Sequence, residues 1–429
     1  MREEASAAAA LTTRRDDRLV MKFGGTSVKS IDRIERVARH VMAGRAAGYK
    51  VCVNVSAMAG ETDRLVDLAT SAFGNKAARM AEYDTVVSTG EQVTAGLLSL
   101  VLQRHGIAAR SWLGWQLPFQ TDARHGAATI HEIDTSSLGD SLEAGEVAVV
   151  AGFQGIDEEG RITTLGRGGS DTSAVALAIA LNAGRCDIYT DVDGVYTSDP
   201  RIVPSARRLD QISYEEMLEM ASLGAKVLQT RSVGLAMRYG VPLRVLSSLG
   251  EPGESKVFTQ IMSEQEIMER RVVSAVVPSR SEARVDLLGV PDKPGVSAMI
   301  FTALAAAKVN IDMIIQSQSR DSASVNLSFT LKEQDLSIAQ SVLAERKSDI
   351  GYTEILADQN VAKVSIIGVG MNDRSGVAAQ MFETLSSRGI NILNISTSEI
   401  KISVLVSSEY TELAVRALHD SFGLRQSSA

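Results

Sequence analysis

The feature that most constrains the fold of this chain is an internal repeat near its C-terminus. Each of two segments contains an apolar strand, a glycine-containing turn and a helix; they read LLGVPDKPGVSAMIFTALAAAKVNIDMI and IIGVGMNDRSGVAAQMFETLSSRGINILNI. A glycine precedes an asparagine by fifteen residues in both, from Gly295 to Asn310 and from Gly376 to Asn391. Each copy continues into a further strand and a closing helix. The order β-α-β-β-α, used twice, predicts two copies of one small α+β sandwich.

Ahead of the repeat, strand-like and helix-like runs alternate. The expected strands include RLVMKF, KVCVNVSA, EVAVVAGF, CDIYTDV and VPLRVLSS, and one long helix is expected over residues 213–240. Such alternation predicts an α/β fold with a mostly parallel sheet covered by helices. We expect a tail without function over residues 1–17, a first domain over 18–250, and a linker over 251–271. A second region over 272–429 would hold the repeats, at about 283–350 and 361–425, with interleaved strands allowed.

Composition excludes several classes of protein. A net charge of -8 provides no broad basic field for nucleic acid or an anionic membrane. No run approaches the ~20 apolar residues of a membrane span, and the N-terminus lacks the apolar centre of a secretory signal. Cys52 and Cys186 lie in apolar runs and are expected to be reduced and buried, and the five histidines lack the spacing of a zinc site. We expect a cytoplasmic protein without a structural metal.

Two glycine-rich turns could bind phosphate through backbone N–H groups at a helix N-terminus. The first, KFGGTS, covers residues 22–27, and its alternative interpretation is an ordinary strand-to-helix turn with a hydroxyl cap. The second, GRGGSDTS, covers residues 166–173 and is more specific, because a cap alone needs neither three glycines nor an arginine. Neither turn is a Walker loop, and the chain lacks the GxGxxG fingerprint of dinucleotide-binding folds.

There are three further candidates, of which Glu91 and Lys226 have the weaker signals. Residues 190–201, TDVDGVYTSDPR, could form the wall of a nucleotide site, with Tyr196 as a flat surface and Arg201 as a charge. The alternative is a plain surface loop, since Asp-Gly and Asp-Pro are turn signals. Glu91 follows a glycine at a helix start, where it could simply cap the helix. Lys226 falls in the expected long helix, where it could simply be solvated.

Taken together, KFGGTS, STGEQ, TTLGRGGSDTSAVALA, YTDVDGVYTSDPR and the two repeats resemble the aspartokinase family, in its regulated bacterial form with two ACT domains. The resemblance runs from about Leu19 to about Leu424. It implies a three-layer α/β/α amino acid kinase fold followed by two ACT domains. It also implies transfer of phosphate from ATP to L-aspartate, giving 4-phospho-L-aspartate, the first step toward lysine, threonine, methionine and isoleucine. Mg²⁺ is implied as part of MgATP rather than by a visible ligand cluster.

The resemblance also assigns roles to residues. Lys22 would neutralise charge on the transferring phosphoryl group and Asp171 would orient this lysine, so that catalysis is positioning plus electrostatics. Glu91 would bind the substrate ammonium, and Arg167 would bind a carboxylate with two parallel hydrogen bonds. The substrate set is Thr62, Glu91, Arg167, Gly168, Gly169 and Ser170. The nucleotide set is Lys22, Gly24, Gly25, Ser56, Ser170, Thr190, Asp191, Tyr196, Asp199, Arg201 and Lys226.

The repeats are implied to sense lysine and threonine at a subunit interface of a homo-oligomer, either a dimer or a tetramer. The first effector loop would use Asp292, Lys293, Pro294, Gly295, Asn310, Ile311, Asp312 and Gln316, and the second Asn391, Ile392, Thr397 and Ser398. Two departures from the family pattern are Leu117-Pro118-Phe119 and the pair Ser375 and Ala378. Because Ala378 lacks an effector-pocket hydroxyl, we hypothesise that threonine acts weakly here.

Two other functions remain open from the sequence. One is a kinase of the same superfold acting on glutamate, carbamate or a nucleoside monophosphate, which the repeats and STGEQ disfavour. The other is a catalytically inactive amino-acid sensor, which the retention of Lys22, Arg167 and Asp171 disfavours.

Overall fold

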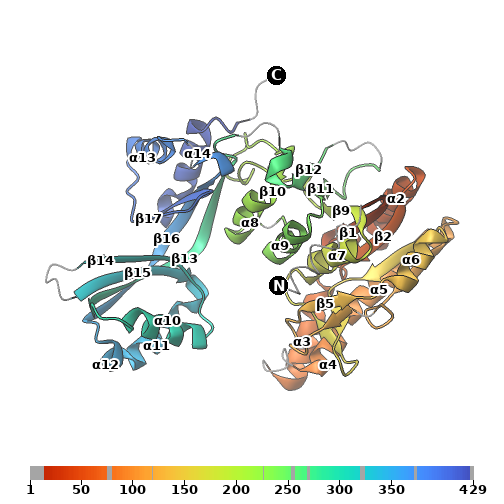
Figure 1. The fold of residues 1–429 in the computed structure, drawn as a ribbon, viewed down its shortest axis with the longest axis horizontal. Coiled ribbons are helices and arrows are strands. Elements are labelled where there is room, and N and C mark those ends of the chain that lie inside the picture. Colours follow the sequence, from red (N-terminus) through yellow and green to blue (C-terminus); the bar gives the residue numbers. More distant parts are fainter. Residues whose placement is uncertain are drawn as a thin grey trace, which may run out of the picture. The chain divides into compact units, whose positions relative to one another are not determined.

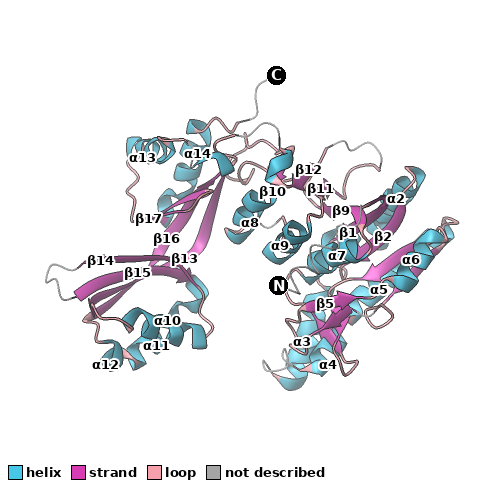
Figure 2. Ribbon diagram, in the orientation of Figure 1, coloured by secondary structure: helices cyan, strands magenta, loops and turns pink. Residues whose placement is uncertain are grey.

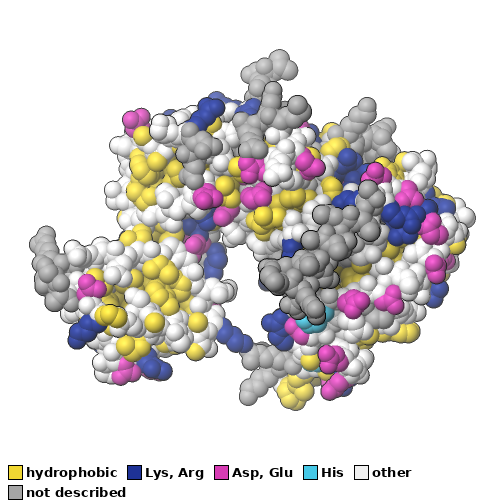
Figure 3. Space-filling view, in the orientation of Figure 1, with side chains coloured by type: hydrophobic (Ala, Val, Ile, Leu, Met, Phe, Trp, Pro, Cys, Tyr) yellow, Lys and Arg dark blue, Asp and Glu magenta, His cyan; other side chains and the backbone are white. Residues whose placement is uncertain are grey.

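The computed structural model describes residues 14–74, 80–117, 119–225, 227–252, 257–267, 271–318, 324–371 and 374–425. The chain forms two compact units, whose elements are labelled in Figure 1 and coloured by type in Figure 2. Unit 1 contains Met1–Val195 and Arg208–Glu269, and unit 2 contains Tyr196–Arg207 and Arg270–Ala429. Acidic and basic side chains are interspersed on the face shown in Figure 3.

The centre of unit 1 is an eight-stranded sheet of order β10-β12-β11-β9-β1-β2-β6-β3. Its strands are β1 (Arg15–Phe23), β2 (Lys50–Val55), β3 (Ala109–Trp112), β6 (Val147–Ala151), β9 (Ala183–Thr190), β10 (Gln211–Ser213), β11 (Leu243–Ser247) and β12 (Thr259–Met262). Every pairing is parallel except that of β11 with β12. The prediction of a mostly parallel sheet is confirmed, although β3, β10 and β12 were not predicted.

Helices cover both faces of this sheet. The helices of unit 1 are α2 (Ile31–Ala46), α3 (Glu61–Phe73), α4 (Ala81–Val87), α5 (Thr89–Arg104), α6 (Ser136–Glu143), α7 (Gly169–Ala180), α8 (Tyr214–Ser222) and α9 (Thr230–Tyr239), with 3₁₀ turns η1 (Gly25–Val28) and η3 (Glu264–Glu266). The α2 and α5 helices share one core with alternate residues of β1, β2 and β6. On the other face, α7 packs against β1 and β9 with its first ten residues buried, including the polar Ser170, Asp171, Thr172 and Ser173 near its N-terminus.

By length and composition alone, the helical stretch Ala81–Arg104 could cross a membrane. However, 56% of its most apolar window is buried inside unit 1. The α5 helix within this stretch packs against β3 and β6 of the parallel sheet. Its apolar composition is therefore that of a core helix.

A second, four-stranded sheet of order β5-β4-β7-β8 lies in unit 1 and was not predicted. It consists of β4 (Phe119–Thr121), β5 (Ile130–Ile133), β7 (Gln154–Ile156) and β8 (Ile162–Thr164). Leu117 and Phe119 are buried here, while Pro118 lies outside the described residues. The end of β8 leads directly into the second glycine-rich turn.

Two element boundaries differ from the sequence-based expectation. The expected helix over 213–240 is two helices, because Gly224 adopts a left-handed φ of 107° just beyond the end of α8. Lys226 follows this break and lies outside the described residues. At the N-terminus, β1 begins at Arg15 inside the expected tail, and Arg15 pairs with Glu143 at 2.8 Å. Residues 1–13 lie outside the described residues.

Unit 2 is built on one six-stranded sheet of order β14-β15-β13-β16-β18-β17. Its elements are β13 (Ala275–Pro291), α10 (Val296–Ala306), β14 (Ile311–Gln318), β15 (Ser324–Lys332), η4 (Glu333–Asp335), α11 (Leu336–Glu345), α12 (Lys347–Ile350), β16 (Glu354–Ile367), η5 (Val369–Met371), α13 (Val377–Ser387), β17 (Asn394–Thr397), β18 (Lys401–Ser407), η6 (Ser408–Tyr410) and α14 (Thr411–Ser421). The predicted order β-α-β-β-α occurs in both copies.

The two copies share their long central strands. The start of β13 contributes Val276 to the core of the second copy, and its later part contributes Val285 and Leu287 to the core of the first. Gly295 and Gly376 occupy the same N-cap position of α10 and α13, with φ of 97° and 104°. These left-handed conformations explain why both copies carry glycine there.

The segment Tyr196–Arg207 belongs to unit 2, although we expected it within the first domain. Ile202, Val203 and Ala206 join the core of the second copy. Thr197 is buried and its hydroxyl lies 2.9 Å from Nε2 of His419. Burial of these side chains moves the domain boundary away from its sequence-based position.

Candidate active site

The predicted site residues of unit 1 meet at the carboxyl ends of neighbouring parallel strands. Backbone hydrogen bonds link these ends: Gly24 N donates to Tyr189 O at 3.4 Å, and Ser56 N donates to Phe23 O at 3.1 Å. Gly152 N, after β6, donates to Val55 O at 3.0 Å. The carboxyl edge of a parallel sheet is where ligands bind in open α/β folds.

A buried ion pair lies at this edge. Lys22, near the end of β1, and Asp171, in the first turn of α7, are only 9% and 8% exposed. The Lys22 ammonium pairs with Asp171 Oδ1 and lies beside Gly24, where an added Cβ would stand 3.4 Å from Nζ. Two predicted catalytic residues, separated widely in sequence, are therefore in contact.

Asn54 holds the N-terminus of α7 in place and was missed by sequence reasoning. It is the last but one residue of β2 and has no exposed surface, and its Nδ2 donates to Ser170 O at 2.9 Å. The Ser173 hydroxyl donates to Asn54 Oδ1 at 3.2 Å. A single polar residue inside the apolar run VCVNV was the available signal, because a buried amide requires partners.

Close backbone approach explains two of the site glycines. An added Cβ on Gly25 would lie 2.9 Å from Ala57 O, and one on Gly168 would overlap the side chain of Gln229. Gly168 also has a left-handed φ of 71°. Phe153, whose φ is 70°, packs against Gly169. Neighbouring groups therefore leave no room for a side chain at these glycines of the two turns.

Glu91 is a buried carboxylate with one unsatisfied oxygen. It lies in the first turn of α5, is 3% exposed, and accepts a hydrogen bond from Ala57 N at 3.0 Å through Oε1. Its Oε2 is buried and has no hydrogen-bond partner among the described residues. Burial raises the pKa of Glu91 to about 7. A bound cation or hydrogen-bond donor would satisfy this oxygen.

The other predicted substrate residues are more accessible. Arg167 is exposed and forms no ion pair with any residue that the structure describes, so its guanidinium is available to a ligand. Thr62, at the second position of α3, and Gly168 are half-buried, whereas Gly169 and Ser170 are buried.

The residues predicted to form a nucleotide wall are divided between the units. Thr190 ends β9 in unit 1, and its hydroxyl donates to the exposed Asp191 at 3.1 Å. In unit 2, Tyr196 packs against the core of the second copy, and Arg201 pairs with Asp199 at 2.7 Å on the surface. Their binding of a nucleotide stays a prediction.

Part of the first predicted effector loop lines a pocket of about 320 Å³ in unit 2. Its lining includes Asp292, Lys293, Pro294, Gly295 and Gln316. Among the other predicted residues, Asn310 precedes β14, Ile311 begins it, and Asp312 pairs with the buried Lys363. Burial, the largest single effect, would raise the pKa of Asp312, but the hydrogen bond to Lys363, the charge of Lys363 and further contacts together lower that pKa.

The second predicted effector loop lies before and after β17. Asn391 and Ile392 precede this strand, and Thr397 ends it. Ser398 N donates to Lys401 O at 2.8 Å, which closes the turn into β18. Ala378 packs against the core of the second copy.

Within the described residues, no group of three or more His, Cys, Asp or Glu side chains forms a metal site. A magnesium ion that arrives with a nucleotide would have its phosphate oxygens as ligands. Cys52 and Cys186 are both free and buried, as predicted.

Comparison with known proteins matches both units to family models. Residues 17–247 match the model of the amino acid kinase family. Residues 286–346 and 364–422 each match the model of an ACT domain. These ranges contain the ion pair at the sheet edge and the two repeats.

Individual relatives match nearly the whole chain. An aspartokinase of Pseudomonas aeruginosa is 52% identical over 406 residues, which cover 95% of this chain and 97% of the relative. Aspartokinase 2 of Bacillus subtilis is 47% identical, with coverage of 95% and 98%. The structure of E. coli aspartokinase III in complex with aspartate and ADP matches with a TM-score of 0.78 and 28% identity, covering 94% of this chain and 99% of that one.

Proposed function

Since this chain belongs to the amino acid kinase family, as an aspartate kinase with two ACT domains, we propose the following reaction for it. The γ-phosphate of MgATP passes to the side-chain carboxylate of L-aspartate, giving 4-phospho-L-aspartate. We place this reaction in the cytoplasm, as the first step of lysine, threonine and methionine biosynthesis.

The observation that carries this proposal is the buried ion pair of Lys22 and Asp171 at the carboxyl edge of the sheet. Phosphoryl transfer needs positive charge fixed beside the transferring group, and a partly desolvated ammonium interacts more strongly than one in water. Asp171 holds the Lys22 ammonium in one place before the substrates arrive. Gly24 and Gly25 leave room for phosphate oxygens to approach the backbone.

The acceptor needs little chemical help. An aspartate carboxylate is already ionised near neutral pH, so it requires no strong general base. We propose that Glu91 binds the substrate ammonium through its unsatisfied Oε2 and that Arg167 binds a carboxylate through two parallel N–H groups. Thr62 and Ser170 complete this clamp. Catalysis then rests on orientation and electrostatic stabilisation.

For regulation, we propose that lysine, threonine or both bind the ACT region and inhibit the enzyme. E. coli aspartokinase III, a 28% identical protein, has been crystallised in complex with lysine and aspartate. The pocket beside Asp292 and Gln316 has the size and mixed charge that suit a free amino acid. We propose a homo-oligomer assembled through the ACT domains, and weaker inhibition by threonine because of Ala378.

The test is ATP-dependent acyl-phosphate formation, trapped as the hydroxamate, with L-aspartate, L-glutamate or no acceptor. We expect turnover with aspartate, suppressed by lysine plus threonine, and loss of turnover in Lys22→Ala. Turnover with glutamate instead would identify another carboxylate kinase of this family. An absence of turnover in the wild-type chain would support the alternative of an inactive amino-acid sensor. Full inhibition by threonine alone would contradict the proposal that threonine inhibits weakly.

A further inference from the structure

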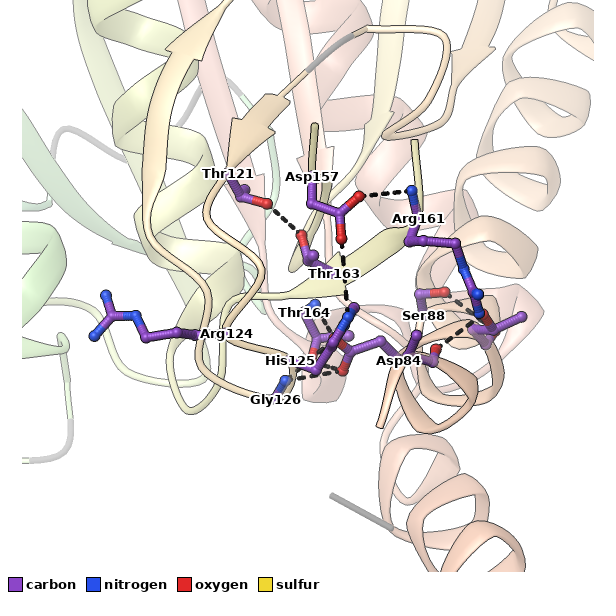
Figure 4. A network of polar contacts seen from close by, with 12 residues as sticks. Asp84, Ser88, Thr121, Arg124, His125, Gly126, Asp157, Arg161, Thr163 and Thr164 are labelled. Atoms are coloured by element: carbon purple, nitrogen blue, oxygen red, sulfur yellow. Dashed lines mark hydrogen bonds and ion pairs between the residues drawn. The ribbon is translucent and has the colours of Figure 1, made fainter. Parts of the chain in front are cut away.

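A buried polar network lies behind the second glycine-rich turn, and Asp84 is at its centre (Figure 4). We propose that Asp84 is a positioning residue that fixes the turn carrying Arg167 relative to the helix carrying Glu91. This inference rests on the proposed function, in which these two side chains bind the carboxylate and the ammonium of the substrate.

The Asp84 carboxylate is fully buried and accepts hydrogen bonds from three residues of two other segments. Its Oδ2 receives His125 Nδ1 at 2.8 Å and Thr164 N at 2.9 Å. Its Oδ1 receives the Thr164 hydroxyl at 2.5 Å, and Gly126 N lies 3.1 Å from both oxygens. A carboxylate with this many donors is satisfied only as an acceptor, so neither an amide nor an alkyl group could replace it without leaving donors unpaired.

These contacts reach the turn through Thr164. Thr164 is the last residue of β8, three positions before Arg167, and Asp84 binds both its backbone N–H and its hydroxyl. Its carbonyl accepts from Ala128 N at 2.9 Å. An added Cβ on Gly166 would lie 2.9 Å from Gly126 O, so the loop that Asp84 holds also packs directly on the turn.

Arg231, a residue of α9, makes a second set of contacts with the same two segments. Arg231 donates to Leu165 O at 2.9 Å and to Ala128 O at 2.8 Å. It therefore bridges the residue after Thr164 to the loop that contains Gly126. Because Asp84 and Arg231 both hold it, the backbone that leads into the Arg167 turn has little freedom to move.

The network returns to α4 through further polar contacts. His125 Nε2 lies 3.9 Å from Asp157 Oδ2, and Asp157 Oδ1 accepts from Arg161 N at 2.8 Å. The Arg161 guanidinium pairs with Glu82 of α4 at 2.7 Å. His125 thus lies between two carboxylates, and Arg161 ties the hairpin of β7 and β8 to the helix that carries Asp84.

The position of Asp84 also connects the Arg167 turn to Glu91, the other proposed substrate-binding residue. The α4 helix ends at Val87, and α5, which carries Glu91, begins two residues later at Thr89. Gln154 Nε2 donates to Ser88 O at 3.1 Å and holds the junction between them. Asp84 is therefore joined through a short stretch of chain to Glu91 and through Thr164 to Arg167, so it sets the spacing of the two groups.

The test compares two adjacent, fully buried threonines. Thr164→Val deletes the hydroxyl that binds Asp84, whereas the matched control Thr163→Val deletes a hydroxyl that lies 2.6 Å from Thr121 instead. We expect Thr164→Val to raise the KM for aspartate at least about tenfold, with a much smaller change in the KM for ATP and in kcat. Thr163→Val should keep the wild-type KM, and Thr164→Ser should restore it.

Equal KM values for aspartate in Thr164→Val and Thr163→Val would overturn the inference. So would an increase in the KM for ATP of Thr164→Val as large as the increase in its KM for aspartate. If Thr164→Val does not fold, His125→Asn and His125→Leu replace it, because asparagine keeps a donor near the Nδ1 position and leucine does not. The leucine variant alone should then bind aspartate weakly, and equal binding by both would refute the role. Failure of the wild-type chain to phosphorylate aspartate would instead refute the proposed function.

Discussion

Acidification from pH 8 to pH 6 should weaken the productive binding of L-aspartate through one residue, Glu91. Burial raises the pKa of this carboxyl from its ordinary value of 4.5 to about 7. About nine tenths of it is then ionised at pH 8 and about one tenth at pH 6. Because only the ionised form can pair with the substrate ammonium, kcat/KM for aspartate should fall about tenfold over this range.

The variant Glu91→Gln isolates this effect. Glutamine can still accept the hydrogen bond from Ala57 N but carries no charge, so binding loses a buried, charge-assisted interaction worth about 3 kcal/mol. That loss corresponds to a rise of roughly 150-fold in the KM for aspartate. The dependence of kcat/KM on pH between 6 and 8 should also disappear in the variant.

The assay is hydroxamate formation at limiting aspartate across this pH range, for wild type and variant. The control is kcat/KM for MgATP at saturating aspartate, which should change little because Glu91 is then paired. A Glu91→Gln enzyme that keeps the wild-type pH profile would refute the reasoning, since another group would then carry the titration.

The same pKa predicts a change in stability of known sign. The native state disfavours the ionised carboxylate by about 3 kcal/mol, at about 1.4 kcal/mol for each tenfold change in the ionisation constant. This cost is absent below the unfolded value of 4.5 and fully present above pH 7. The free energy of unfolding of Glu91→Gln, relative to wild type, should therefore rise by about 3 kcal/mol from pH 4.5 to pH 8 in urea titrations.

Three further predictions concern other parts of the chain. Lys22→Met should lower kcat at least about 100-fold in steady-state assays because it removes the charge beside the phosphoryl group, and a loss below tenfold would contradict this role. Gly168→Ala should impair aspartate binding, since its Cβ would overlap Gln229, whereas Gly60→Ala, at a left-handed φ of 83° with open space around it, should cost only about 1 kcal/mol of stability and leave KM unchanged. Burial lowers the pKa of His419 below 6.5, so stability should be complete above that pH and fall on acidification to pH 5; a His419→Gln chain with an equal fall would disprove this.

Local chemistry made much of unit 1 predictable. The strands that end at Phe23 and Val55 and the helix that begins at Gly169 follow from apolar runs and glycine-rich turns, which act within a few residues. Lys22 and Asp171 could be selected because each lies in such a turn. Their ion pair was implied only by the resemblance. It forms because β1 and β9 are parallel neighbours, which brings the end of β1 close to the start of α7.

Other features have no local signature. Asp84 sits on a short helix with an unremarkable sequence, and its partners His125 and Thr164 are distant in the chain, so only packing reveals their network. Asn54 and Arg231 are similar cases. The break before α9 also escaped prediction, since the amphipathic pattern continues across Gly224 while its left-handed backbone ends the helix.

The sequence by itself determined the repeated ACT units, the parallel α/β domain and the identity of the charged and glycine residues at the sheet edge, because periodicity and turn chemistry are properties of neighbouring residues. Tertiary structure alone decided that Tyr196–Arg207 packs with unit 2, that β13 passes through both copies, and that Glu91 is buried with an unsatisfied oxygen. Burial depends on which distant segments cover a side chain. The environment that shifts the pKa of Glu91 therefore exists only in the folded chain.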